Sequence, residues 1–376
     1  MKVRVALNLV FLVPGETGGM EIYARELIAR LGELEGVEPV ALVNREAAAD
    51  RDGPWGQAVP MRVVPVNARN RLQWVRGEQQ HVPRMAAAEG CALIHSLAST
   101  APLRSRARRV TTIHDLNYKL VPDAHFGLRG LGMRALVPLA ALRSHRVIVD
   151  AASTRADLVK HLRTRTEKID VVPLGVTLAP PVTPTRAAEL RERLALGDRP
   201  VLLSVSAKRP HKNLGRLLEA VAGIPSERRP ALVLPGYRTP HEAELRGRAA
   251  DLGLAGDVAF PAWLPAADLE GLYALATAFV FPSLHEGFGL PVLEAMARGV
   301  PVATSARSSL AEVAGDAALL FDPEDVRAIR AAIERLLGDP PQAARLRAAG
   351  LERARAFTWE RTADLTAASY ERALAE

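Results

Sequence analysis

Cysteine is almost absent from this 376-residue chain, since Cys91 is its only one. No disulfide can therefore form within the chain, and a reducing cytoplasm is the expected compartment. No apolar run approaches the roughly 20 residues that a membrane-spanning helix needs. The apolar start, residues 1–13, lacks the small-residue cleavage site of a secretory signal, so we expect it to form a first buried strand.

Acidic residues are scarce in one part of the chain. The net charge is +7, and residues 60–109 hold nine arginines against two glutamates. Such a bias favours an anionic partner for the first half: a membrane surface, nucleic acid or an acidic acceptor. A solvated, arginine-rich surface is the alternative. Residues 126–136 could add an amphipathic helix with apolar and basic faces.

Short apolar runs alternate with helical stretches along the whole chain. Val3–Leu9 is the first such run, Val201–Val205 opens a second series, and a Pro/Thr-rich stretch, Leu178–Thr185, separates the two series. Strands that alternate with helices indicate parallel sheets covered by helices on both faces. We therefore predict an α/β protein with two doubly wound, Rossmann-like domains, residues 1–177 and 178–356. An amphipathic helix is predicted over residues 357–376.

The segment Phe281–Met296 contains two carboxylates eight positions apart, Glu286 and Glu294, with a glycine-rich turn between them. A buried strand is predicted before the turn, and Pro291 suits the first turn of a helix after it. A strand, a tight loop and a helix N-terminus present free N–H groups and a positive dipole end to an anion. An anion held by amides beside two acids that accept hydroxyl hydrogen bonds is typical of a nucleotide-sugar site.

A basic segment, Ser204–Leu214, follows the first strand of the second predicted domain and opens a helix. It contains Arg209 and the run Pro-His-Lys212-Asn. At such a turn a lysine supplies a mobile charge for phosphate groups, and an arginine supplies a forked donor. A solvated basic turn is the alternative.

Strand ends in the first half carry further polar and flexible residues. His114, followed by Asp115, ends an apolar strand at the edge where ligands bind open parallel sheets. It could donate to a sugar hydroxyl or, when neutral, accept from one. His95 also ends a strand. Gly18 and Gly19 follow the first strand and allow a phosphate or sugar to approach the backbone closely.

These segments together resemble the retaining glycosyltransferases of family 4 (glycosyl transferases group 1). The resemblance rests on Glu-x7-Glu, Pro-His-Lys-Asn, Thr-Ile-His-Asp-Leu, and Gly-Gly followed by Glu, and it runs nearly end to end. It implies the GT-B fold, in which two Rossmann-like domains face a central cleft and a C-terminal helix packs back on the first domain. The chain departs from the family at Ser206-Ala207, where many members carry Gly-Arg or Gly-Asn, and at Ala262, where glycine is usual.

The resemblance implies roles for individual residues. Lys212 and the amides near Gly289 would stabilise the departing diphosphate, Glu286 would bind hydroxyls of the donor sugar, and Glu294 would bind the ribose. Arg209 is the candidate for a second diphosphate cation. The implied catalytic residues are His114, Lys212 and Glu286. The implied donor-binding residues are Gly18, Gly19, Arg209, Lys212, Glu286, Gly287, Phe288, Gly289, Leu290 and Glu294. The acceptor-side candidates are His95 and Asp115.

By the same resemblance, the reaction moves a hexose of the mannose type from a nucleoside diphosphate sugar, GDP- or UDP-linked, with retention of configuration. The acceptor would be a glycan or a lipid-linked glycan of cell-surface polysaccharide synthesis. We expect no cofactor, no metal ion and no nucleic-acid partner, and a location in the cytoplasm or peripherally on the inner face of the plasma membrane.

Two alternatives stay open: an inactive nucleotide-sugar-binding protein of the same fold, and a transferase with a small soluble acceptor. Other enzyme classes are disfavoured. A GT-B phosphorylase would need a pyridoxal lysine, yet no lysine follows Lys212. A dinucleotide oxidoreductase would need Gly-x-Gly-x-x-Gly, which Gly15, Gly18 and Gly19 do not form.

Overall fold

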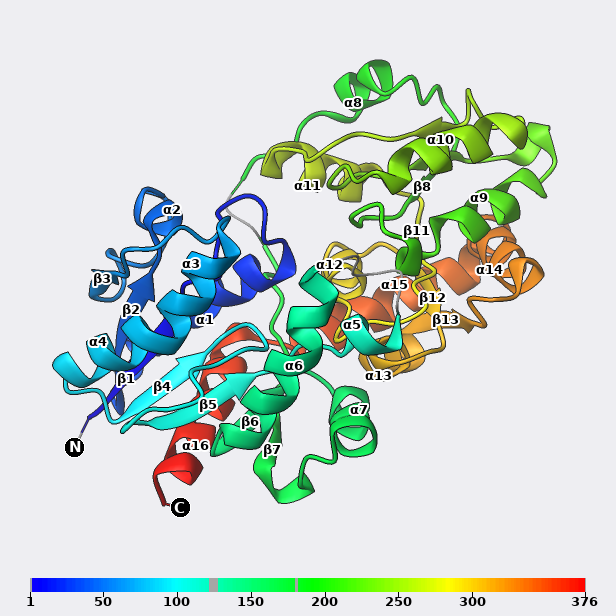
Figure 1. Ribbon diagram of the computed structural model, residues 1–376. Helices are drawn as coiled ribbons and strands as arrows, with labels where there is room; N and C mark the ends of the chain where they lie inside the picture. Colours follow the sequence, from blue (N-terminus) through cyan, green and yellow to red (C-terminus); the bar gives the residue numbers. More distant parts are fainter. Residues whose placement is uncertain (1, 122–127, 180–181, 376) are drawn as a thin grey trace. The chain divides into compact units, whose positions relative to one another are not determined.

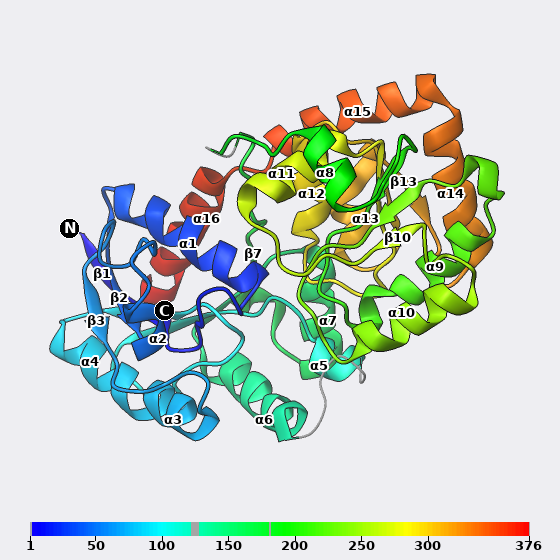
Figure 2. The ribbon, with the colours of Figure 1, turned by 90° about the horizontal axis from the view of Figure 1, so that it is seen from above.

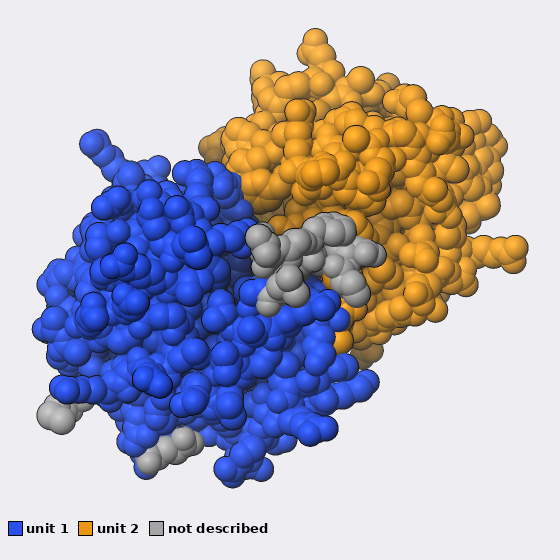
Figure 3. Space-filling model, viewed as in Figure 1, with its two compact units in different colours: residues 1–119, 125–175, 358–376 blue, residues 120–124, 176–357 orange. Residues whose placement is uncertain are grey.

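The computed structural model describes residues 2–121, 128–179 and 182–375 (Figure 1). It divides into two units: unit 1 contains residues 1–119, 125–175 and 358–376, and unit 2 contains residues 120–124 and 176–357 (Figure 3). The chain passes from unit 1 to unit 2 after Gly175 and returns after Phe357. Residues 126–127 of the predicted amphipathic helix and 180–181 of the predicted linker lie outside the described residues.

Unit 1 is built on a parallel sheet of seven strands in the order β3-β2-β1-β4-β5-β6-β7. Because β4 pairs with β1 on the side opposite to β2, the winding of the chain reverses between β1 and β4. Ligands bind open parallel sheets at the carboxyl ends of the strands flanking such a reversal. The strands are β1 Val3–Leu9, β2 Val37–Val43, β3 Met61–Val63, β4 Leu93–Ser96, β5 Arg108–Thr112, β6 Arg146–Val149 and β7 Ile169–Val171.

Helices cover both faces of this sheet. In Figure 2, α1 and α16 lie on one side of the strands and α3, α4 and α6 on the other, in agreement with the contacts of α16 with α1 and β5 and of α4 with β1. The helices of unit 1 are α1 Gly19–Glu33, α2 Arg45–Ala48, α3 Arg71–Arg76, α4 Val82–Ala88, α5 Asn117–Leu120, α6 Leu128–Arg143, α7 Ala152–Leu162 and α16 Trp359–Ala375, with a π-helix at Gly77–His81.

The last of these helices, α16, belongs to unit 1 although it follows all of unit 2 in the chain. Its buried residues recur every three or four positions and form one stripe: Trp359, Thr362, Ala363, Thr366, Ser369, Tyr370 and Ala373. Such a stripe is the face that an amphipathic helix turns toward a core. At its start α16 lies against Gly175, where a Cβ would be only 2.3 Å from the backbone nitrogen of Trp359.

Unit 2 repeats the same plan with a parallel sheet of six strands in the order β10-β9-β8-β11-β12-β13. The winding reverses between β8 and β11, which are neighbours. The strands are β8 Val201–Leu203, β9 Ala231–Val233, β10 Val258–Ala259, β11 Ala278–Phe281, β12 Val302–Ser305 and β13 Ala318–Phe321. The helices are α8 Ala187–Arg193, α9 Leu214–Ala222, α10 His241–Asp251, α11 Ala266–Leu275, α12 Leu290–Ala297, α13 Ser309–Ala314, α14 Val326–Gly338 and α15 Pro340–Arg355.

The predicted fold class is confirmed: the protein is α/β, with two doubly wound parallel sheets. Apolar side chains from β8, β11, α9 and α14 fill the core of unit 2, because both faces of a covered parallel sheet are dry. Within the described ranges, no helix combines the length and the apolar character needed to cross a membrane.

Candidate functional site

In unit 2, the predicted donor residues follow the two strands at which the winding reverses. The segment after β8 carries Lys208, Arg209 and Lys212, and the segment after β11 carries Glu286 and the start of α12. Both segments leave the carboxyl edge of the same parallel sheet, since β8 and β11 are hydrogen-bonded neighbours. This edge is the expected binding edge of a doubly wound sheet.

Lys212 and Glu286 form an ion pair, with 2.6 Å between Nζ and Oε1. Their side chains are only 17% and 12% exposed, so the pair is shielded but still reaches the surface. Burial raises the pKa of Glu286, but the charges of Lys212 and His211 and hydrogen bonds from Lys212 and Ser283 outweigh it, and the pKa lies below its ordinary value. Glu286 is therefore ionised at neutral pH, and each member of the pair can exchange its partner for a charged or polar group of a ligand.

Backbone contacts explain why these residues meet although they are 74 positions apart. Asn213 has a left-handed φ of 59°, and its side-chain amide donates to the carbonyl oxygen of Pro282 at 3.0 Å. The N–H of Leu284 donates to the carbonyl oxygen of His211 at 2.9 Å. The segment after β8 is thus fastened to the segment after β11.

The N-terminus of α12 lies directly after this loop. Gly289 precedes it with a φ of 105°, and a Cβ there would lie 2.5 Å from Cδ2 of Leu310, so only glycine fits without displacement. No side chain caps α12. Pro291 has no N–H and the Val292 N–H donates to the carbonyl oxygen of Gly289, so the N–H of Leu290 and the helix dipole are what the helix end offers to an anion. Leu290 is the first residue of the helix, and the Ser309 hydroxyl donates to the carbonyl oxygen of Phe288.

Glu294 lies one turn into α12 and is partly buried. Its Oε2 accepts a hydrogen bond of 2.9 Å from the hydroxyl of Tyr273. Burial raises the pKa of Glu294, and this effect exceeds the opposing influence of Arg298 and of the Tyr273 hydrogen bond. Arg298 is itself held by Glu270 through two hydrogen bonds of 3.0 and 2.7 Å. A packed cluster thus fixes the direction of the Glu294 carboxylate.

Arg209 and Gly287 complete the predicted donor set in unit 2. Arg209 is half-buried, and its guanidinium forms no ion pair with any residue in the described part of the chain, so it is available for an anion. Gly287 lies in the loop between Glu286 and α12. The roles assigned to these residues stay predictions.

In unit 1, His114 follows β5 and is bonded through both ring nitrogens. Nδ1 lies 2.7 Å from Oδ2 of Asp150 and Nε2 lies 3.0 Å from the carbonyl oxygen of Leu97. Burial lowers the pKa of His114, but the charge and the hydrogen bond of Asp150 outweigh it and raise the pKa above its ordinary value. While Asp150 is ionised, both nitrogens carry protons, so Nε2 must leave Leu97 before it can donate to a ligand.

The two acceptor-side candidates have structural partners. His95 lies within β4 with no exposed surface, between the Tyr370 hydroxyl of α16 and the Thr112 hydroxyl of β5, each at 2.8 Å. Burial lowers its pKa to about 3, so it is neutral. Asp115 accepts a hydrogen bond from the Asn117 N–H at the start of α5. These contacts give both residues a role in the fold, and an acceptor contact stays a prediction.

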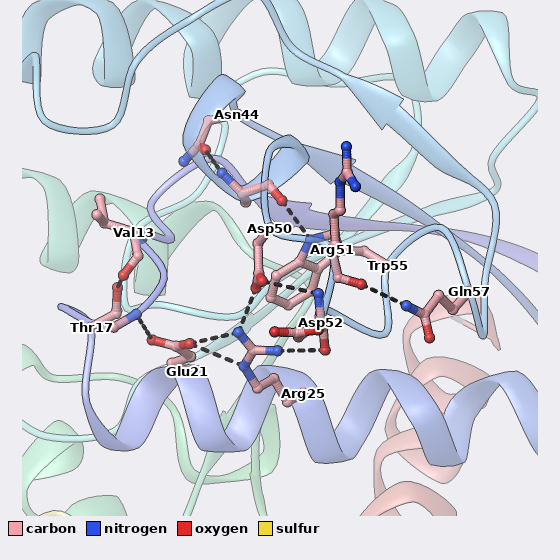
Figure 4. A network of polar contacts seen from close by, with 12 residues as sticks. Val13, Thr17, Glu21, Arg25, Asn44, Asp50, Arg51, Asp52, Trp55 and Gln57 are labelled. Atoms are coloured by element: carbon pink, nitrogen blue, oxygen red, sulfur yellow. Dashed lines mark hydrogen bonds and ion pairs between the residues drawn. The ribbon is translucent and has the colours of Figure 1, made fainter. Parts of the chain in front are cut away.

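The glycine loop before α1 is anchored by a polar network (Figure 4). Gly18 has a φ of 64° and precedes α1, which no side chain caps. The Glu21 carboxylate accepts from the Gly15 N–H at 2.8 Å and from Nε of Arg25 at 3.0 Å. Arg25 also donates to Asp50 at 2.5 Å. The conformation of the loop around Gly18 and Gly19 therefore depends on α1 and on the segment after α2.

Sequence reasoning missed several of these partners. It gave Asp150 no role and passed over Tyr273, Lys208 and the acids of the run Asp50-Arg51-Asp52. For Asp150 a signal existed: β5 and β6 are each followed closely by a polar residue, His114 and Asp150, and parallel neighbours bring their carboxyl ends together. Among the described residues, no group of three or more histidine, cysteine, aspartate or glutamate side chains is placed to hold a metal ion.

Comparison with known proteins identifies matches to both halves of the chain. The family described as Glycosyltransferase Family 4 matches residues 17–179, and Glycosyl transferases group 1 matches residues 186–353. The O-antigen chain mannosyltransferase B of Escherichia coli is 32% identical over 268 residues, which is 70% of each chain. A GDP-mannose-dependent alpha-(1-6)-phosphatidylinositol monomannoside mannosyltransferase of Mycolicibacterium smegmatis is 34% identical over 68% of each chain.

A solved structure agrees with the fold. HepE of Anabaena, in complex with UDP-glucose, superposes with a TM-score of 0.77 over 98% of this chain and 99% of its own, at 20% sequence identity. At that identity the likeness concerns the fold, which is the two-domain GT-B architecture.

Proposed function

This chain belongs to glycosyltransferase family 4, and we propose that it moves a hexose of the mannose type from a nucleoside diphosphate sugar to a glycan or lipid-linked acceptor. The anomeric configuration is retained in the proposed reaction, and the product contributes to a cell-surface polysaccharide. The mannosyltransferases of Escherichia coli and Mycolicibacterium smegmatis support the sugar, because each is more than 30% identical over two thirds of its length. HepE, solved with UDP-glucose, supports a nucleotide-sugar donor.

One observation carries the proposal: the Lys212–Glu286 pair and the uncapped N-terminus of α12 occur together at the carboxyl edge of one sheet. When a donor binds, Lys212 and the N-terminus of α12 stabilise the negative charge that develops on the departing diphosphate. Glu286, released from Lys212, accepts hydrogen bonds from hydroxyls of the sugar, and Glu294 accepts from the ribose. In this proposal Lys212 and the helix end act without a divalent metal ion.

To test this proposal, the purified protein is incubated with a panel of nucleoside diphosphates and of the corresponding nucleoside diphosphate hexoses. Thermal shift first identifies the nucleotide, because a ligand that binds only the folded protein raises its melting temperature. Nuclear magnetic resonance of the product then gives the anomeric configuration. Turnover with inversion would contradict retention, and nucleotide binding without transfer or hydrolysis would favour the inactive binding protein.

The two glutamates should respond differently to substitution. Glu294→Gln should weaken binding of the free nucleoside diphosphate by about tenfold, since the charge-assisted part of the ribose contact is worth roughly 1.5 kcal/mol. Glu286→Gln should leave that affinity almost unchanged and reduce affinity for the complete nucleotide sugar, because its partner is the hexose. Calorimetry with both ligands checks the order. The opposite order would exchange the two roles.

We further propose that unit 1 binds an anionic membrane surface, which would suit a lipid-linked acceptor. Exposed apolar and basic residues alternate on α3, where Leu72 is 85% exposed between Arg71 and Arg76. The exposed residues of α6 include Leu139, Leu142, Arg134 and Arg143. Figure 2 shows both helices along the same side of the unit. By contrast, Arg104 and Arg106 precede β5, and Arg108 and Arg109 are its first two residues, so these arginines lie toward the amino ends of the strands.

Liposome co-sedimentation tests this membrane proposal. Binding should require anionic lipid and weaken with salt, as screening shortens the reach of each charge. Replacing Arg71 and Arg76 by serine should weaken it by about 2 kcal/mol, since each basic residue near an anionic leaflet contributes about 1 kcal/mol. Arg155→Ser with Arg165→Ser, which removes equal charge elsewhere, is the matched control. Equal recovery with neutral and anionic vesicles, or none with either, would argue for a soluble acceptor.

A further inference from the structure

Lys208 is a fully buried lysine at the binding edge of unit 2. Its side chain has 0% exposure, and its ammonium donates hydrogen bonds of 2.7 Å to the carbonyl oxygens of both Gly236 and Pro261. The nearest acid is Glu242, with 3.9 Å between Nζ and Oε2. Buried lysines are rare unless their charge is compensated, so this one calls for an explanation.

The two carbonyl groups belong to different loops. Gly236 follows β9 and Pro261 follows β10, while Lys208 itself follows β8, so one ammonium joins the carboxyl ends of three neighbouring strands. The backbones also meet directly: the Ser206 N–H donates to the Pro235 carbonyl at 3.1 Å. At Gly236, with a φ of 143°, a Cβ would lie 2.0 Å from the oxygen of Ser206.

The loops that Lys208 joins carry an aromatic pair. The rings of Tyr237 and Trp263 are stacked, with centroids 4.4 Å apart and planes 19° apart. Trp263 is 57% exposed, so the pair offers a flat surface at the same edge as Lys212. Aromatic faces in such a place stack well on planar rings of a ligand. One ring comes from each loop, and their stacking depends on the spacing of the two loops.

We propose that Lys208 is a positioning residue of the nucleotide site, which holds the loops after β9 and β10 so that Tyr237 and Trp263 present one rigid face to the base of the donor. This role rests on the proposed function of unit 2 as the nucleotide-sugar-binding unit. Lys208 does not touch the ligand. It acts through the two backbone carbonyl groups, which no apolar residue in its place could bind.

The proposal has a pH signature. Burial lowers the pKa of Lys208 to about 8; Glu242 opposes this shift, and Arg246 and Arg238 add to it. A neutral amine still donates to both carbonyl groups, but charge-assisted hydrogen bonds are about twice as strong. Nucleotide binding therefore favours the protonated lysine, and affinity should fall as pH rises through about 8.

Calorimetry with GDP and with UDP between pH 6.5 and 9.5, roughly spanning that transition, tests the proposal. The wild type should lose about threefold or more in affinity across the range. Lys208→Met should bind about tenfold more weakly at pH 7 and show no such loss. Lys160→Met, which removes an exposed lysine of α7, should match the wild type at every pH.

A second variant tests the proposal even if Lys208→Met does not fold. Glu242→Gln keeps the lysine and its hydrogen bonds but removes the acid that raises its pKa, so the wild-type loss of affinity should begin at lower pH. If the wild type binds a nucleotide and Lys208→Met binds it equally well at all pH values, or if Glu242→Gln leaves the profile unmoved, Lys208 has no positioning role. If the wild type binds neither GDP nor UDP, this result contradicts the proposed function as well.

Discussion

Replacing Lys212 by methionine should weaken the binding of a nucleoside diphosphate about 10- to 150-fold, because a charge-assisted hydrogen bond is worth roughly 1.5–3 kcal/mol. The substitution keeps the volume of the side chain and removes its charge. In the structure the ammonium lies 2.6 Å from Oε1 of Glu286, a residue of the loop that leads into the uncapped end of α12. No second lysine in the described part of unit 2 can replace it, because the ammonium of Lys208 is buried and donates to the carbonyl oxygens of Gly236 and Pro261.

The same substitution leaves the shielded carboxylate of Glu286 without its cation, so it should also lower the free energy of unfolding, by about 3 kcal/mol at most. The double variant Lys212→Met with Glu286→Gln separates the two effects: stability should recover and nucleotide affinity should not. Arg228→Met, an exposed change in the same unit, serves as the control. Affinity that stays at the wild-type value in Lys212→Met would place the diphosphate elsewhere.

The pKa of Glu286 adds a test on the acid side. Its folded-state pKa lies below the ordinary value near 4.5, so the ion pair contributes stability above the ordinary pKa and loses it as pH falls through the folded value. Lys212→Met should remove this contribution. The difference in unfolding free energy between wild type and variant should therefore shrink below pH 4.5.

Gly175→Ala should be one of the most damaging additions of a single methyl group in the described chain. The added Cβ would lie 2.3 Å from the nitrogen of Trp359 and 2.6 Å from the carbonyl carbon of Thr358. Both are backbone atoms at the start of α16, so no side-chain rotation relieves the clash. A loss of about 3–5 kcal/mol in the unfolding free energy is expected, at the upper end for single substitutions.

Urea unfolding followed by tryptophan fluorescence reports this loss, because three of the four tryptophans, Trp55, Trp74 and Trp359, belong to unit 1. Gly247→Ala is the control: it lies inside α10, nothing stands within 4 Å of its Cβ position, and it should stabilise unit 2 by about 0.5–1 kcal/mol. If the Gly175→Ala protein is as stable as the wild type, the backbone at residue 175 can move away from the start of α16 at little cost in free energy.

The fold could be predicted from the sequence where strands are long and buried on both faces. Val3–Leu9 and Ala278–Phe281 are strands with the predicted bounds. By contrast, β3 and β13 were not predicted, since Met61–Val63 has only three residues and Ala318–Phe321 is partly exposed at the sheet edge. Each of these short edge strands forms because it pairs with one neighbouring strand. The hydrophobic pattern of the segment itself does not reveal that pairing.

The sequence identifies candidate residues for the site, but not the contacts that these residues make. Lys212 and Glu286 carry recognisable motifs, yet their pairing depends on the order of β8 and β11 in the sheet. The partnership of Glu294 with Tyr273 depends on how α11 packs beside α12. The burial of His95 could not be predicted either, because α16, which is distant in sequence, covers this strand end with Tyr370. Tertiary packing decides each of these cases.

The position of α16 in the chain also dictates an order of synthesis. A ribosome releases the strands of unit 1 first, but the helix that covers β5 and β6 emerges only after all of unit 2. Unit 2 can fold as soon as it leaves the tunnel, whereas unit 1 must wait with an apolar sheet face uncovered, the kind of surface on which nascent chains aggregate. Chaperones that shield such a face during translation would therefore act on the half of the protein that is made first and completed last.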